Sequence, residues 1–430
     1  MDDEAAHALL TGLAAEHRVP GAQLVVRAPG GTAVAAVGTG PFTHETAVPL
    51  GSLTKPFTAT LAMMLVADGE VDPDAPVTEY LREPVPPVTL RQLLGHLAGL
   101  PSDVAEHTTG TVSRSRWVTR YCGPDTLAHP PGTVFSYSNA GYLLAAHLVE
   151  VITAMSWHEA VSAVLLEPLG ITPSFVAGPA TARPATAGHT VTADHVLPVA
   201  DQSLPELEAP AGALALSAAD LVTFARLHWA DPGLPRLLEP EAAQAMRADG
   251  TASIEAGPFG LADGWGPGWA LYRHAGRTWY GHDGTGTGTS CHLRFEPASG
   301  TAVGFTTTAG TGLAMWADVV EALRAAGVPV GSYSLSTLPR AGRPAGASPG
   351  CEGRYINGES EFTVVGDPGG GLRMLVDGTP YADLTCFDDR CFTLRELAGE
   401  SVYIGRFLGG PPAGRAECVQ AIGRVARRCG

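Results

Sequence analysis

The chain has 430 residues, of which 45% are hydrophobic and 16% charged, and its formal net charge is −16 at pH 7. This length predicts two or three domains, or one large domain with an addition, and the apolar content is ample for buried cores. The negative charge argues against nucleic acid and anionic membrane surfaces as partners, and no apolar run reaches the roughly 20 residues of a membrane span.

The N-terminus and the cysteines bear on the compartment. Met1-Asp2-Asp3-Glu4 is acidic and has neither the basic n-region nor the apolar h-region of a secretory signal. The 7 cysteines are odd in number and form no Cys-x-x-Cys pair, which fits a reducing compartment. Five of them lie in the last eighty residues, as they would in a disulfide-stapled tail domain. We expect a cytoplasmic protein.

The first predicted elements are a helix over residues 5–17 and a hairpin over Gly21–Val37, which would form the edge of a sheet. An apolar segment, Phe57–Val66, follows with the periodicity of a helix, and Gly69 ends it as a left-handed C-terminal residue. The sequence Ser-x-x-Lys stands at the start of this helix, so the two polar side chains can meet at i, i+3.

Composition singles out the lysine of this pair. Lys55 is the only lysine among 27 basic residues, and it lies three residues after Ser52. Lysine can lose its proton when it is desolvated, whereas arginine cannot. A serine hydroxyl needs such a base beside it to attack a carbonyl. A capping serine with a solvated lysine is the alternative interpretation, and the spacing alone leaves both open.

Two further groups of polar residues lie at the ends of predicted helices. The short helix Leu90–His96 ends in a histidine that we expect to pack or cap. Tyr137-Ser138-Asn139 follows a tight turn and precedes the apolar helix Leu143–Ile152. Tyr137 and Asn139 would project from this loop, although Ser138 or Asn139 could also serve only as a helix cap.

The second half of the chain begins with an irregular stretch, residues 175–209, where substrate preference is usually set. A helix over Ser217–His228, with Ser217 as its N-cap, comes next. Antiparallel strands around the segment Gly281–Ser290 and a last helix then complete an α+β arrangement. These elements are expected at Ala270–Arg273, Thr278–Tyr280, Cys291–Phe295, Ala302–Thr307 and, for the helix, Ala314–Ala326.

Residues 331–350 are rich in Gly, Ala, Pro and Ser and indicate a linker, followed by a small all-β unit over residues 351–430. Gly346-x-Ser348-x-Gly350 has the pattern of a hydrolase nucleophile elbow, but it lies in the linker with no strand before it. The 14 histidines form no His-Glu-x-x-His, so we expect no metal site.

Three motifs stand in order: Ser52-x-x-Lys55, Tyr137-x-Asn139 and His282-x-Gly284. With Leu90–Pro101, they resemble the serine β-lactamase-like and penicillin-binding-protein-like superfamily over roughly residues 5–330. The branch is that of class C β-lactamases, DD-peptidases, D-aminopeptidases, family VIII-type esterases and transacylases. The resemblance implies an antiparallel sheet flanked by helices plus an all-helical subdomain, in a catalytic domain of residues 1–330. Several members also carry a C-terminal β domain.

The resemblance also implies roles. Ser52 would be the nucleophile, and Lys55 would take its proton, alone or with Tyr137. The residue patterns leave the choice of base open. Asn139 would bind the substrate amide or orient Lys55. His282 would supply a polar group that need not be charged at pH 7, and Gly284 would allow close approach of the backbone. The backbone N–H groups of Ser52 and Thr285 would form the oxyanion hole. No cofactor is implied.

One departure from the family narrows the substrate. His282 and Asp283 replace the lysine and threonine that help bind a substrate carboxylate, and an aspartate there would repel an anion unless it points away or is paired. We therefore expect an intracellular esterase or amidase, or a transacylase with a small ester or amide substrate and an amine or alcohol acceptor. A DD-peptidase, D-aminopeptidase or β-lactamase, and a weakly catalytic binding or sensor module, are the alternatives.

Overall fold

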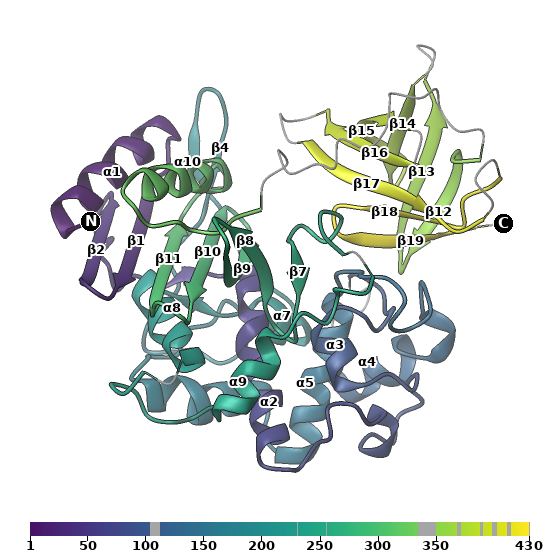
Figure 1. The fold of residues 1–430 in the computed structure, drawn as a ribbon, viewed down its shortest axis with the longest axis horizontal. Coiled ribbons are helices and arrows are strands. Elements are labelled where there is room, and N and C mark those ends of the chain that lie inside the picture. Colours follow the sequence, from purple (N-terminus) through teal and green to yellow (C-terminus); the bar gives the residue numbers. More distant parts are fainter. Residues whose placement is uncertain are drawn as a thin grey trace.

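The computed structural model describes residues 1–103, 112–229, 231–254, 256–333, 350–367, 371–387, 390–397, 402–410 and 414–429. It has three parts: a sheet with helices on both faces, a helical region below it, and a separate β-barrel (Figure 1). The N-terminus lies at the outer edge of the sheet, and the C-terminus lies on the barrel.

The central sheet has seven antiparallel strands in the order β2-β1-β11-β10-β9-β8-β7. Its two faces enter different cores, because Leu24 and Val26 pack with α1 and α10 whereas Val25 packs with α8. The bounds are β1 (Gly21–Ala28), β2 (Gly31–Gly38), β7 (Gly264–Trp265), β8 (Ala270–His274), β9 (Arg277–Gly286), β10 (Thr289–Glu296), β11 (Thr301–Thr307), α1 (Asp3–Glu16), α8 (Ala218–Ala225) and α10 (Gly312–Ala325).

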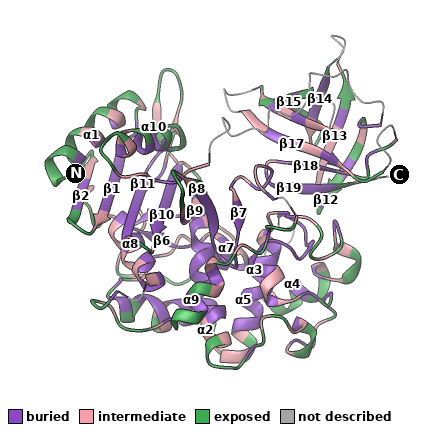
Figure 2. Ribbon diagram, in the orientation of Figure 1, coloured by how far each residue is buried: buried purple, intermediate pink, exposed green. Residues whose placement is uncertain are grey.

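The helical region is built on α2 (Lys55–Ala67) and α5 (Asn139–Thr153), which pack against each other. Most of both helices is buried, as Figure 2 shows, so they carry apolar residues on all sides. Around them lie α3 (Leu90–Leu94), α4 (Arg114–Tyr121), α6 (Trp157–Ala160), α7 (Ala209–Gly212) and α9 (Pro240–Arg247). Two short strand pairs complete this part of the chain: β3 (Val48–Pro49) with β6 (Ala215–Leu216), and β4 (His189–Val191) with β5 (Val196–Pro198), of which β4 lies beside α10 (Figure 1).

The C-terminal domain is a closed eight-stranded barrel with its own apolar core. All neighbouring strands pair antiparallel, and closure of β12 on β19 leaves no open sheet edge. The strands are β12 (Gly353–Asn357), β13 (Ser360–Gly366), β14 (Leu372–Val376), β15 (Thr379–Cys386), β16 (Cys391–Glu396), β17 (Val402–Leu408), β18 (Cys418–Ala421) and β19 (Arg424–Arg428).

The barrel is attached to the N-terminal part of the chain through buried polar contacts. Asn357, which is 4% exposed, accepts from the N–H of Ser102 at 2.6 Å and donates to the carbonyl of Val425 at 2.7 Å. Gln420 is fully buried and donates to the carbonyl of Phe135 at 2.7 Å. Leaving such buried groups unpaired would cost ~1–3 kcal/mol each, so these bonds fix the barrel's position.

The predicted fold class is confirmed: an antiparallel sheet with helices, a helical region and a C-terminal all-β domain. Ser217 is the N-cap of α8 as expected, accepting from the N–H of Asp220. The predicted linker and the Gly346–Gly350 pattern lie largely outside the described residues. The helices α4, α6 and α9 were not predicted, and the β4–β5 pair lies in the stretch that we expected to be irregular.

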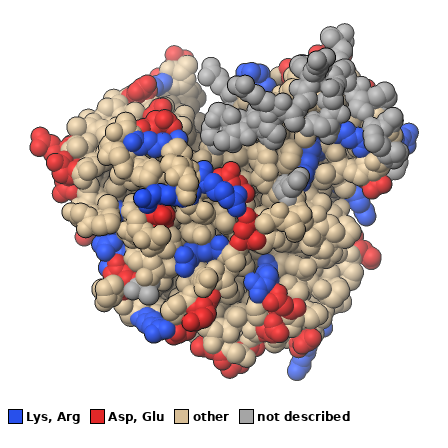
Figure 3. Space-filling model, viewed as in Figure 1, with Lys and Arg blue, Asp and Glu red and all other residues tan. Residues whose placement is uncertain are grey.

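Among the described residues, no single helix is long and apolar enough to cross a membrane. One pair, Asn139–Thr153 with Trp157–Leu169, meets that test together by length and composition but is bent by 78°. On the face shown in Figure 3, acidic and basic side chains are interspersed over a mostly uncharged surface.

Strand β9 lies directly on the turn that carries Ser52. A Cβ added at Gly284 would lie 2.0 Å from the carbonyl oxygen of Leu50 and 2.7 Å from the backbone nitrogen of Leu53. The predicted strand Thr278–Tyr280 is thus too short: β9 continues to Gly286 because its glycines permit this backbone contact.

We expect Gly284→Ala to displace the Ser52 turn and to destabilise the fold by ~1–3 kcal/mol through overpacking. Gly12→Ala in α1 is the control, since nothing lies within 4 Å of its added Cβ and alanine favours a helix. Urea unfolding of both variants provides the measurement. A Gly284→Ala midpoint equal to that of wild type would contradict the close contact.

Candidate active site

Ser52 lies in a 3-10 turn, η1 (Gly51–Thr54), that runs directly into α2. The turn begins at a left-handed residue, Gly51 with φ +53°, and a Cβ there would lie 2.2 Å from the carbonyl oxygen of Thr285. Glycine is required at this position both by its φ and by the neighbouring strand. The backbones of the turn that carries Ser52 and of β9 therefore meet at Ser52 and Thr285, the two residues expected to supply the oxyanion donors.

Lys55 is fully buried at the first turn of α2. Its Nζ donates to Ser52 Oγ at 3.1 Å and to the carbonyl oxygen of Ala211 at 2.9 Å. Burial lowers the pKa of Lys55 to about 7, and the positive charge of Arg424 adds to this effect against the opposing pull of Asp103 and Glu208. The lysine is thus poised to exchange a proton near neutral pH.

Tyr137 faces the same centre from the loop before α5. The Lys55 Nζ lies 5.0 Å from the centroid of the Tyr137 ring. The buried ring of His96 stacks on the Tyr137 ring, with the two centroids 4.2 Å apart and an interplanar angle of 27°. Its hydroxyl is buried near Ser52 without a hydrogen bond of ordinary geometry. Burial raises the pKa of Tyr137 well above its ordinary value, and Ser52 and Arg424 offset this only in part.

The loop of Tyr137 is held by the barrel. The N–H of Tyr137 donates to the carbonyl of Gly423 at 2.8 Å, and the N–H of Val425 donates to Ser136 Oγ at 3.1 Å. The turn between β18 and β19 has two left-handed residues, Ile422 and Gly423, in the manner of a two-residue hairpin. This turn places Arg424 with its guanidinium 5.8 Å from the Tyr137 ring centroid.

His282 on β9 is buried and 2% exposed. Burial and the nearby Lys55 lower the pKa of His282 to about 3, so the imidazole is neutral at pH 7. Its Nδ1 lies 2.6 Å from the carbonyl oxygen of Asp283, which identifies Nδ1 as the protonated nitrogen. Nε2 is left without a partner among the described residues and can accept a hydrogen bond.

The carboxylate of Asp283 is paired. It lies 2.6 Å from His292 Nδ1 and 2.7 Å from a guanidinium nitrogen of the fully buried Arg294. Burial acts to raise the pKa of Asp283, but Arg294 and His292 hold it well below its usual range. The expected repulsion of an anion by this residue is therefore largely cancelled.

The same network contains a Ser-His-Asp chain, because Ser290 Oγ lies 2.9 Å from His292 Nε2. This order of groups is that of a hydrolytic triad. However, Ser290 and His292 are both fully buried, and Trp316 stacks on the imidazole at 4.8 Å. A substrate has no access to this serine, so the chain supports Asp283 rather than a second active site.

Asn139 is the first residue of α5, and Ser138, not Asn139, caps that helix by accepting from the N–H of Gly141. The Asn139 side-chain amide donates to Asp103 at 2.9 Å. It makes no described hydrogen bond to Lys55, whose orientation comes from Ala211 instead. Asn139 lines a cavity with Ser52, where it remains available for a substrate amide.

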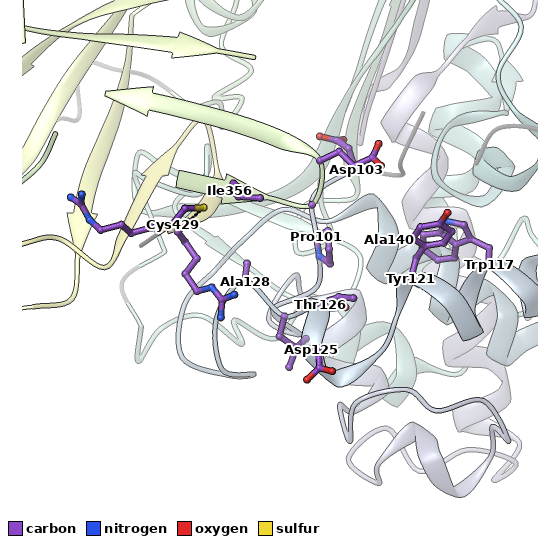
Figure 4. Close-up of a pocket in the computed structure, with 15 residues that line it drawn as sticks. Pro101, Asp103, Trp117, Tyr121, Asp125, Thr126, Ala128, Ala140, Ile356 and Cys429 are labelled. Carbon is purple, nitrogen blue, oxygen red and sulfur yellow. Dashed lines mark hydrogen bonds between the residues drawn. The ribbon is translucent and has the colours of Figure 1, made fainter. Parts of the chain in front are cut away.

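Two cavities meet at Ser52 and Thr285. One, of 380 Å³, is bordered by Asn139, Glu208 and Ala211 among others. The other, of 180 Å³, is bordered by Tyr137, His282, Trp265 and the barrel residues Ile422–Arg424. A third, of 480 Å³, lies between α4 and the barrel, is lined in part by Trp117, Tyr121 and Ile356 (Figure 4), and does not include Ser52.

The structure thus brings the sequence-predicted residues around one point: Ser52, Lys55, Tyr137, Asn139, His282, Asp283, Gly284 and Thr285. Sequence reasoning missed Arg424, Ala211 and Glu208. No motif marks them, and Arg424 belongs to a domain in which no chemistry was recognised. The described residues contain no group of three or more His, Cys, Asp or Glu able to hold a metal ion.

Comparison with known proteins shows the family of this chain. The family model described as Beta-lactamase matches residues 6–326. Penicillin-binding protein 4 of Amycolatopsis lactamdurans is 35% identical over 332 residues, covering 72% of this chain and 86% of that protein. The chain belongs to the beta-lactamase family. Its predicted membership of the β-lactamase-like and penicillin-binding-like superfamily is confirmed, and with it a serine hydrolase-like fold.

Solved structures extend the similarity to the barrel. SurE is 36% identical, with a TM-score of 0.88 and coverage of 99% of both chains; a structure of SurE with D-Leu has a TM-score of 0.85 and the same identity and coverage. A D-stereospecific amidohydrolase from Streptomyces sp. is 25% identical, with a TM-score of 0.59, and covers 72% of this chain and 94% of that one.

The charge of Arg424 gives a pH prediction. Modification of Ser52 by a fluorophosphonate needs neutral Lys55, so its rate should rise with pH through a midpoint of about 7. Arg424 Nη2 also lies 3.8 Å from Asp103 Oδ1. Arg424→Gln therefore removes a cation that disfavours protonated Lys55 and leaves the charge of Asp103, which favours it, without this ion pair. The pKa of Lys55 should therefore rise and the profile should move to higher pH.

Arg427→Gln is the matched control, because Arg427 lies on the same strand, β19, and is exposed. Its profile should coincide with that of wild type. A midpoint that stays in place or moves to lower pH in Arg424→Gln would show that the barrel does not tune Lys55.

Proposed function

We propose that this protein is a serine acyl-transfer enzyme. Ser52 attacks the carbonyl of an ester or amide, and the acyl-enzyme passes its acyl group to water or to an amine or alcohol. The observation that carries the proposal is the buried Lys55, with Nζ 3.1 Å from Ser52 Oγ and a pKa lowered to about 7. At neutral pH a large share of this lysine is unprotonated and can accept the serine proton.

Lys55, rather than Tyr137, is the base in this proposal. Burial raises the pKa of Tyr137, so its phenolate is scarce near neutral pH, whereas the same burial makes neutral Lys55 abundant. A protonated Tyr137 hydroxyl can still donate to the leaving group. Its position near Ser52 suits this role: Tyr137 gives its proton to the leaving group, while Lys55 holds the proton taken from Ser52.

The oxyanion would bind to the backbone N–H groups of Ser52 and Thr285. Both residues border the two cavities that meet at the nucleophile, and the close contact at Gly51 keeps their backbones together. Each such donor is worth on the order of 3 kcal/mol in the transition state.

We further propose that the acyl donor is an amino acid or peptide derivative of D configuration. The support comes from relatives: SurE has been solved with D-Leu, and the Streptomyces protein is named as a D-stereospecific amidohydrolase. The neutral His282 offers no positive charge where the family's lysine would stand, so on this side of Ser52 the positive charge in the cavity lining comes from Arg424 instead.

Intact-protein mass spectrometry tests the nucleophile. The protein is incubated briefly with D- and L-phenylalanine p-nitrophenyl esters, a penicillin, a cephalosporin and a fluorophosphonate. The fluorophosphonate and the phenylalanine esters should give a mass gain in wild type, with the D ester ahead of the L ester. Ser52→Ala should give none. Lys55→Arg should slow acylation by about 10² or more, because it keeps the charge but removes the base.

Circular dichroism of both variants controls for folding. Fast adducts from the penicillin or cephalosporin alone would favour a β-lactamase or peptidase, and an adduct that never turns over would favour a sensor module. An active Lys55→Arg would overturn the role of Lys55. Addition of amines or alcohols to the acyl-enzyme then separates transfer from hydrolysis by the product formed.

A further inference from the structure

Glu208 lies directly before α7, the helix whose Ala211 carbonyl accepts from Lys55. It ends the 3-10 turn η7 (Glu206–Glu208), and α7 begins at the next residue. That helix supplies the Ala211 carbonyl that holds Lys55 Nζ at 2.9 Å. The segment that orients the base therefore also brings a carboxylate to the site.

Glu208 borders the 380 Å³ cavity that opens on Ser52. Among the described residues that line this cavity, Glu208 alone carries a charge. The others are neutral: Pro49, Gly51, Ser52, Asn139, Val176, Gln202, Ser203, Leu204, Ala211, Gly212, Thr285, Gly286 and Thr287. The cavity on this side of the nucleophile is thus suited to a cation rather than to an anion.

The carboxylate of Glu208 is half-buried and has no hydrogen bond or ion pair within the described parts of the chain. Burial and the negative charge of Asp103 both raise its pKa, and the charge of Lys55 counteracts this only in part. The other acidic groups near the site do have partners: Asp283 is paired with Arg294, and Asp103 accepts from Asn139. A desolvated carboxylate without a partner is costly, and a cation bound beside it would offset that cost.

We propose that Glu208 binds the protonated amino group of a ligand in this cavity and so selects ligands with a free amine. The inference rests on the acyl-transfer function proposed above. Lys55 does not serve as the cation that pairs with Glu208, because its Nζ is hydrogen-bonded to Ser52 and Ala211. The amine belongs either to the acyl donor or to the molecule that accepts the acyl group.

Binding of an amine would also affect the base. The negative charge of Glu208 favours protonated Lys55. A ligand ammonium that neutralises Glu208 removes this pull, so neutral Lys55 becomes more abundant when the cavity is filled. Binding of the amine in the cavity thus increases the fraction of unprotonated Lys55 that can take the proton of Ser52.

The test compares Glu208→Gln with Glu206→Gln, its exposed neighbour on the same turn. The donors are the methyl esters of D-phenylalanine and of N-acetyl-D-phenylalanine. If the amine is the donor's, Glu208→Gln should lower kcat/KM about tenfold for the free amine and little for the acetylated ester. Glu206→Gln should leave both values unchanged.

A second arm uses the acetylated ester with D-leucinamide as acceptor. If the amine is the acceptor's, Glu208→Gln should lower the ratio of transfer to hydrolysis and leave the preference between donors unchanged. A third arm needs no turnover: in Ser52→Ala, calorimetry should show that D-leucinamide binds about tenfold tighter than its N-acetyl derivative, and Glu208→Gln should abolish the difference.

If Glu208→Gln changes none of these three ratios, or lowers activity equally for charged and neutral ligands, the amine site is wrong. Failure of the acyl-enzyme itself is separate, because it is read from the absence of a Ser52 adduct with the fluorophosphonate in wild type.

Discussion

The site depends on a single lysine kept out of water. Lys55 is fully buried, and its Nζ has two oxygen acceptors, Ser52 Oγ and the Ala211 carbonyl. Neither acceptor is charged, so the positive form is poorly stabilised and the proton is held weakly. The glycines at the contact of η1 with β9, the buried helix α2 and the segment before α7 all serve to maintain this arrangement. Arginine in its place would keep its proton, which explains why a lysine stands at this position.

The two sides of Ser52 differ in charge, and they come from different parts of the chain. One side carries Glu208, whose carboxylate has no hydrogen bond or ion pair within the described residues. The other carries Arg424 from the barrel, next to a neutral His282 and a paired Asp283. Two ligand ends of opposite polarity would therefore enter in one orientation only, and the reacting carbonyl would lie between them. The charges on the two sides of Ser52 thus favour one binding orientation of the ligand, in addition to any selection by its shape.

The sequence predicted the motifs of the site well because their chemistry is local. Ser52 and Lys55 share a helical turn, and Tyr137 and Asn139 share a loop, so spacing alone relates them. Residues that meet the site from afar carry no such signal: Arg424 is 372 positions from Ser52 by number and lies on a barrel strand. The helix α4 was missed because its charged surface, with Trp117 and Val118 as its buried residues, hides the apolar periodicity. The pairing of Asp283 was foreseen as an option but required the register of β9 on β10 to decide.

The hairpin between β18 and β19 is bound to the Tyr137 loop mainly through backbone groups. The carbonyl of Gly423 and the N–H of Val425 make the contacts, whereas the side chains of Ile422 and Arg424 extend along the cavity wall. Side chains on this turn can consequently change without loss of the attachment. A new preference can therefore arise by replacement of Ile422 at the tip of an accessory domain, whereas replacement of Arg424 would also change the pKa of Lys55.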